Sequence, residues 1–101
     1  MRVIVAPSAR IDLLAIGDFI SRENPARAAT FIAELCAACM QLAQNSMAYP
    51  LRPTLGEEIR VRFYRSYAII YRIDPNRLSV VRVSHGARDL ESLIISDQEV
   101  E

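Results

Sequence analysis

The chain has 101 residues, enough for one domain and too few for two, and its 51% hydrophobic and 24% charged content excludes a disordered segment. Its formal net charge of zero argues against general binding to nucleic acid. No signal peptide is expected, because Arg10 and Asp12 interrupt the apolar stretch after Met1, and no apolar run approaches the roughly 20 residues that span a bilayer. We therefore expect a single cytoplasmic domain over residues 1–101.

The first 45 residues predict a strand followed by two helices. Met1–Ala6 carries β-branched residues at its centre and predicts a short strand, after which Ser8 is a candidate N-cap of the first helix. The second helix is predicted over Pro25–Gln44, with Asn24 as its cap and Pro25 at its first position. Each helix has one apolar stripe at spacings of three and four. The stripes are Ala9, Leu13, Ile16 and Ile20, then Ala28, Ile32, Leu35, Cys39 and Leu42. They suit an antiparallel helical hairpin closed by a turn at residues 22–24.

Cys36 and Cys39 form a C-x-x-C in the middle of the second predicted helix. A redox motif is expected at the start of a helix, where the dipole lowers the pKa of a thiol. A zinc site needs about four ligands, and the single histidine, His85, is distant in sequence. We therefore predict two buried thiols and neither a metal nor a cofactor.

The second half of the chain predicts a three-stranded antiparallel meander. The loop at Asn45–Gly56 is broken by two prolines and a glycine. The strands are predicted at Ile59–Tyr64, Ser66–Ile73 and Leu78–Val83, with a turn at Asp74–Arg77, a short helix or tail at Arg88–Ile95 and an acidic end at Ser96–Glu101. The resulting fold class is α+β: an N-terminal edge strand, and a helical hairpin on one face of an antiparallel sheet, in the order β-α-α-β-β-β.

Charge is unevenly distributed along the chain. Residues 52–88 contain eight arginines and three carboxylates, a charge of +5, which leaves −5 on the remainder. All twelve basic residues are arginine, which suits paired contacts with carboxylates and phosphates. We expect several of these arginines on the sheet face that the helices leave open.

Four segments, in this order and at these spacings, resemble the ParE/RelE superfamily of toxins from type II toxin–antitoxin systems. They are Ala9–Ile20 with Asn24-Pro25, Arg52–Gly56, Ser66–Arg72 and Val81–Asp89. Each segment also has a structural interpretation. Leu13, Ile16 and Tyr71 would be core positions in any α+β domain, and Gly86 would permit a bend. The resemblance implies a partner, a ParD-like antitoxin, in a hetero-oligomer, and a role in plasmid stabilisation.

The RelE branch of the superfamily cuts mRNA in the ribosome, which needs a base, cations around the phosphate and a proton donor. By resemblance, Arg60 and Arg62 stand in for its basic pair, and Arg88 for its late arginine. The chain departs from the pattern at Ala68, where active members have an arginine, and at the apolar residues 93–95 of the tail. Arginine is also a poor general base, and His85 and Tyr64 lie elsewhere than the expected base.

The missing groups favour the ParE branch, which is understood to poison DNA gyrase, and a binding protein over an enzyme. We predict no catalytic residue and four target-contact residues, Arg60, Arg62, Arg82 and Arg88. Each arginine has a competing interpretation, solvation of the sheet or pairing with carboxylates such as Glu57, Glu58 and Asp89. His85 marks a further site segment, although it is more often structural than catalytic. The alternatives are a RelE-like ribosome-dependent mRNA endonuclease and a toxin-like domain without toxicity. Neither membrane association nor sequence-specific nucleic-acid binding is expected.

Overall fold

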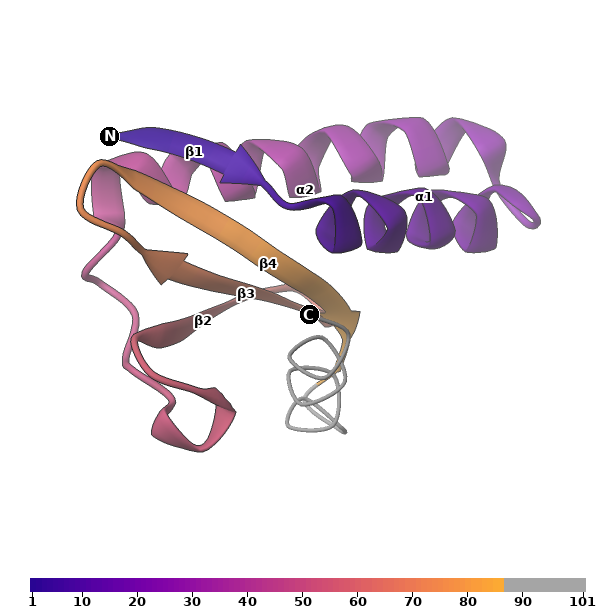
Figure 1. Ribbon diagram of the computed structural model, residues 1–101. Coiled ribbons are helices and arrows are strands. Elements are labelled where there is room, and N and C mark those ends of the chain that lie inside the picture. Colours follow the sequence, from indigo (N-terminus) through magenta and orange to yellow (C-terminus); the bar gives the residue numbers. More distant parts are fainter. Residues whose placement is uncertain (87–101) are drawn as a thin grey trace.

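A computed structural model describes residues 1–86, so the predicted helix at 88–95 and the acidic end at 96–101 lie outside the described residues. The described chain forms two layers, with both helices on one face of a four-stranded sheet (Figure 1). The elements are β1 (Arg2–Val5), α1 (Pro7–Ser21), α2 (Pro25–Asn45), a 3-10 helix η1 (Pro53–Leu55), β2 (Ile59–Tyr64), β3 (Tyr67–Ile73) and β4 (Arg77–His85). This order confirms the predicted α+β architecture.

The sheet has the strand order β1-β4-β3-β2. The meander β2-β3-β4 is antiparallel, as predicted, with an irregularity at Ile70/Tyr71 where β4 has one extra residue. β1 is an edge strand, but it runs parallel to β4, with Arg2 opposite Arg77, so the sheet is mixed. No tight turn links β1 to β4, because the helical hairpin and two strands separate them, and so nothing imposes antiparallel pairing.

Both helices begin at a proline, but only one start was placed correctly from sequence. Asn24 caps α2 as predicted, and its Oδ1 accepts a hydrogen bond from the Arg27 backbone N–H at 3.0 Å. α1 begins at Pro7 with Ala6 as its N-cap, so Ser8 lies inside the helix and the prediction of Ser8 as N-cap is wrong. The physical reason is that Pro7, whose fixed φ suits the first helical position, starts the helix before Ser8.

The main core lies between the helices and the sheet. The predicted stripes of α1 and α2 are buried or half-buried there, together with Phe31 and Ala38, and they meet β3 and β4 through Tyr67, Ile69 and Tyr71. Cys39 is in this core, but Cys36 is exposed, so the prediction that both thiols are buried is wrong for Cys36. Three residues correspond to almost one helical turn, but Cys36 falls just outside the buried stripe.

By length and composition alone, the 21-residue α2 is long and apolar enough to cross a membrane, contrary to our expectation for any segment of the chain. Its apolar residues Leu35, Cys39 and Leu42 are buried inside the domain. Core helices of compact domains pass the same test, so the length of α2 is weak support for a membrane span.

A second apolar cluster lies on the sheet face opposite the helices. It contains Leu55 of η1 and Ile59, Val61, Ala68 and Ile70 of the sheet, with Val81 packed against it. The strand alternation explains it, because β2 directs Ile59 and Val61 to this face and its arginines to the other. The centre of the open face is therefore apolar.

Candidate functional site

Arg60 and Arg62 lie on the helix-facing side of the sheet. They stand opposite Tyr71 and Ile69, which belong to the main core. Arg62 Nη1 donates to the Ala38 carbonyl at 2.7 Å and to Gln41 Oε1 at 3.3 Å, both on α2. Arg60 Nη1 donates to the Tyr49 carbonyl at 2.5 Å. Arg60 and Arg62 are therefore not among the arginines of the open face, because they extend from the edge strand β2 to α2 and to the loop after it.

Arg82 makes an internal ion pair with Asp12 of α1. Its Nε and Nη2 donate to the two carboxylate oxygens at 2.8 and 3.0 Å, and the Val83 backbone N–H donates to the same carboxylate at 2.8 Å. The pairing of β1 with β4 ends at Val80, so Asp12 accepts from the edge of β4 that β1 leaves unpaired. A role of Arg82 in target contact stays a prediction, and the side chain also fixes α1 on the sheet.

His85 is exposed at the end of β4, where its ring and the Tyr67 ring are in a T-shaped contact at a centroid distance of 5.0 Å. Burial raises the pKa of the Tyr67 hydroxyl. Both side chains line a hollow of about 310 Å³ with Ala15, Ile16 and Phe19 of α1. Within residues 1–86 no carboxylate hydrogen-bonds to His85, so the described site lacks a partner that would orient the imidazole for proton transfer.

Gly86 ends the described chain with the bend that its identity predicts. Its φ of 74° is in the left-handed region, where a Cβ is unfavourable. Its N–H donates to the Ser66 carbonyl at 2.6 Å, so the bend is tied to the β2-β3 turn. Arg88, the fourth predicted contact residue, lies outside the described residues.

A carboxylate-centred cluster at Glu34 was not foreseen from the sequence. Glu34 binds Arg27 at 2.6 Å and accepts from the Tyr64 hydroxyl at 2.9 Å, and Arg65 lies 3.7 Å away. The hydrogen bonds from Arg27 and then from Tyr64 hold the pKa of the Glu34 carboxyl below its usual value. The seven-residue spacing of Arg27 and Glu34, two helical turns, was the available sequence signal. The cluster joins α2 to the end of β2.

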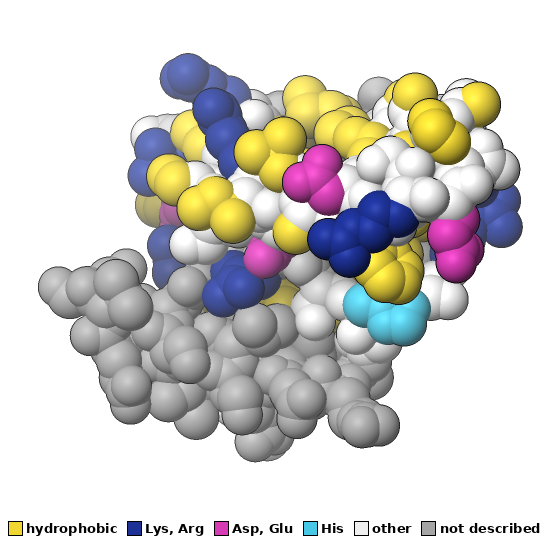
Figure 2. Space-filling view, turned by 90° about the vertical axis from the view of Figure 1, so that its right-hand side faces the viewer, with side chains coloured by type: hydrophobic (Ala, Val, Ile, Leu, Met, Phe, Trp, Pro, Cys, Tyr) yellow, Lys and Arg dark blue, Asp and Glu magenta, His cyan; other side chains and the backbone are white. Residues whose placement is uncertain are grey.

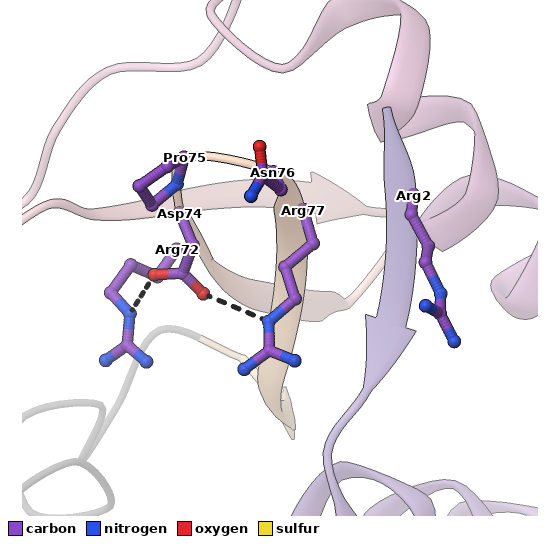
Figure 3. A pocket seen from close by; sticks show the side chains of 6 residues that line it. All are labelled: Arg2, Arg72, Asp74, Pro75, Asn76 and Arg77. Carbon is purple, nitrogen blue, oxygen red and sulfur yellow. Dashed lines mark hydrogen bonds and ion pairs between the residues drawn. The ribbon is translucent and has the colours of Figure 1, made fainter.

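The open face carries Arg72 and Arg77 of the basic segment, as expected, together with Arg2 of β1. Arg72 is two residues after Ile70 on β3 and shares its face, and Arg2 and Arg77 are paired neighbours on β1 and β4. Together with Asp74 they line a hollow of about 520 Å³ at one end of the sheet (Figure 3). None of the three is among the predicted contact residues, and Arg2 could not be placed beside the others because it is far from the basic segment and the register of β1 was unknown.

The outer surface of α1 carries three large exposed apolar side chains. Ile11, Leu14 and Phe19 are 66%, 70% and 68% exposed. A hollow of about 430 Å³ lies on one flank, lined by Leu13, Leu14, Gly17 and Ile32 with Arg10 and Asp18, and the hollow at His85 includes Phe19. Figure 2 shows hydrophobic side chains gathered over the helices, with the imidazole of the only histidine below them. Large apolar patches of this kind on a monomer mark interaction surfaces.

The described surface therefore offers binding groups more than catalytic ones. Arg60, Arg62 and Arg82 contact other parts of the chain, and no group of three or more His, Cys, Asp or Glu within residues 1–86 could hold a metal ion. What remains accessible is apolar surface on α1 and cationic surface at the end of the open face. Both are suited to a macromolecular partner.

Comparison with known proteins agrees with this description. The structure is similar to that of the chromosomal ParDE toxin–antitoxin system from P. aeruginosa, with a TM-score of 0.76 and 18% identity over 85% of this chain and 96% of that chain. It is also similar to the toxin–antitoxin complex RelBE2 from Mycobacterium tuberculosis, with a TM-score of 0.60 and 24% identity over 83% of this chain and 95% of that chain. A search of curated proteins gave no match. Residues 3–90 match the family described as the ParE toxin of the type II toxin–antitoxin system parDE, and the chain belongs to that family.

Proposed function

We propose that this toxin acts by inhibiting DNA gyrase in the cytoplasm and is held inactive by a ParD-like antitoxin encoded with it. The family membership supports the toxin role, and the surface supports action by binding. The observation that carries the choice of gyrase is Ala68. At this position the nuclease pattern has an arginine, and here a fully buried alanine stands in the open-face cluster.

Two further features favour binding over RNA cleavage. Arg60 and Arg62, which correspond to the nuclease basic pair, donate to the backbone carbonyls of Tyr49, after α2, and of Ala38, within α2. His85 has no carboxylate partner within residues 1–86, whereas a general base usually has a group that orients it. Loss of one charge-stabilising group typically costs about 10²–10³ in rate, and loss of the acid–base pair costs more.

The antitoxin is proposed to cover the outer surface of α1. Ile11, Leu14 and Phe19 are exposed there, and hollows on both flanks can accept apolar side chains. A disordered segment that folds on binding would bury this surface at the cost of its own conformational entropy. Acidic residues of the same segment would meet the arginine-rich half of the chain.

The experiment that tests the target compares two reactions with one preparation of toxin. Purified toxin is added to gyrase with relaxed plasmid, and separately to ribosomes programmed with mRNA, each with and without the antitoxin. We expect loss of supercoiling or trapped cleaved DNA, reversed by antitoxin, with the mRNA intact. A His85→Gln variant should behave like the parent, because no proton transfer is required of His85.

The RelE-like alternative predicts the opposite result. Codon-positioned cleavage of mRNA that disappears in the His85→Gln or Arg88→Gln variant, with gyrase unaffected, would overturn the proposal. Absence of both effects would also contradict it and indicate a toxin-like domain without toxicity.

A further inference from the structure

Three arginines from three neighbouring strands converge at one end of the open face. Arg2 and Arg77 are direct partners across β1 and β4, and Arg72 on β3 is opposite Ser79 of β4. Adjacent strands are about 4.8 Å apart, so the three side chains start within roughly 10 Å across the sheet. We call this set, with Asp74, the arginine cradle. Figure 3 shows the three guanidinium groups extending in the same direction.

Asp74 organises two of the three guanidinium groups. Its two oxygens lie 3.1 Å from Arg72 Nε and 3.7 Å from Arg77 Nε, and Ser79 Oγ donates to the carboxylate at 3.3 Å. These contacts involve the Nε atoms of Arg72 and Arg77. The terminal Nη groups of both side chains extend away from Asp74 (Figure 3). The Arg2 side chain has no hydrogen bond or ion pair within residues 1–86. Most donors of the arginine cradle are therefore available to a ligand.

The charge and donor geometry identify the class of ligand. Three guanidinium groups and one carboxylate give a local charge of +2, more than one carboxylate ligand would neutralise. A phosphate monoester carries about −1.5 to −2 at pH 7 and has three terminal oxygens that accept hydrogen bonds. Guanidinium groups bind such oxygens in pairs. The hollow of about 520 Å³ leaves room for more than the phosphate itself.

We propose that the arginine cradle binds a terminal phosphate group, either as inorganic phosphate or as the phosphate monoester of a nucleotide. The site lies at the opposite end of β4 from His85, roughly 27 Å away along a nine-residue strand. It is separate from the outer surface of α1 and does not depend on the choice of target under the proposed function.

The test measures binding directly on the full chain. Nε–Hε signals of 15N-labelled protein are followed by NMR during titration with inorganic phosphate, a nucleoside 5′-monophosphate and the unphosphorylated nucleoside, at constant ionic strength. Both phosphates should shift the signals of Arg72 and Arg77, and the nucleoside should not. Arg2→Gln, Arg72→Gln and Arg77→Gln should each weaken binding about tenfold, because charge-assisted hydrogen bonds are lost. Arg22→Gln is the matched control, since it removes an exposed arginine at the turn between the helices.

The separate titrations distinguish inorganic phosphate from a nucleotide as the ligand. Binding of inorganic phosphate shows that the phosphate group suffices, and binding of the nucleotide alone shows that the rest of the molecule contributes. Equal binding of nucleoside and nucleotide would overturn the proposal, as would an Arg22→Gln variant that weakens binding as much as Arg77→Gln. Absence of binding by either phosphate at millimolar concentration would also overturn it. Gyrase is absent from this experiment, so its outcome is independent of the proposed function.

Discussion

Arg82 of β4 and Asp12 of α1, 70 residues apart in the chain, are joined by two hydrogen bonds of 2.8 and 3.0 Å. The same carboxylate accepts a hydrogen bond from the Val83 backbone N–H. One side chain is therefore the acceptor for both the guanidinium and a backbone donor at the unpaired edge of β4. The two side chains are only 17% and 14% exposed. Beyond Val80 the β1 side of β4 is an open edge, which usually needs a cover against wrong pairing, and α1 provides it here through Asp12.

Replacement of Asp12 by alanine should destabilise the fold. It removes the carboxylate that accepts hydrogen bonds from the part-buried Arg82 guanidinium and from the Val83 N–H, and we expect a loss of about 3 kcal/mol in the free energy of unfolding. Urea denaturation followed by circular dichroism measures it. Asp18→Ala is the control, because Asp18 is an exposed residue on the same helix. Equal losses in the two variants would show that the ion pair contributes nothing beyond an ordinary surface carboxylate.

The Glu34 cluster should make stability depend on pH. Hydrogen bonds from Arg27 and Tyr64 lower the pKa of Glu34 in the folded state, so its contribution is present above the unfolded pKa and is lost as pH falls through the lowered folded value. Glu34→Gln should therefore be less stable than the parent at pH 7, and the difference should shrink in acid below about pH 4. Denaturation at both pH values measures this.

Glu23→Gln is the control for the Glu34 cluster, since Glu23 is exposed at the turn between the helices. It should change stability less than Glu34→Gln at pH 7. A stability difference for Glu34→Gln that stays constant from pH 7 to acid would contradict the assignment of the lowered pKa.

The two cysteines should differ sharply in reactivity. Burial raises the pKa of the Cys39 thiol to about 12, so almost no thiolate is present at pH 8, whereas Cys36 is exposed. Iodoacetamide should label Cys36 in the native protein and Cys39 only after unfolding, as read by mass spectrometry of the peptides. Cys36→Ser should abolish native labelling and keep the fold. Native labelling of Cys39 at the rate of Cys36 would be inconsistent with its place in the core.

The elements and the core could be predicted because both depend on local patterns. The stripes of the helices, the Asn24 cap and the alternation along β2 each leave a periodic signal in the sequence. The place of an arginine side chain in the folded domain leaves no such periodic signal in the sequence. The sequence predicts that Arg60 and Ile59 point to opposite faces of the sheet. It does not specify which of the two faces the helices cover. The convergence of Arg2 with Arg77 depends on a parallel pairing between distant segments, which no local signal specifies.

Two exposed phenylalanines, Phe19 and Phe63, distinguish the proposed antitoxin surface from the open face of the sheet. Phe19 on α1 is 68% exposed beside the hollow at His85, and Phe63 on β2 is 48% exposed on the opposite sheet face. If the antitoxin covers α1, it buries Phe19 and leaves Phe63 in water. Phe19→Gln should then weaken the complex about 10- to 100-fold, since burial of a phenylalanine side chain contributes about 1.5–3 kcal/mol.

Phe63→Gln is the matched control, and calorimetric titration of the antitoxin into each variant measures the affinities. Both variants should keep the fold, as checked by circular dichroism, because both side chains already contact water. The stronger effect should appear in the dissociation rate, because most interface substitutions act there. A Phe63→Gln variant that weakens binding more than Phe19→Gln would place the antitoxin on the open face of the sheet instead of on α1.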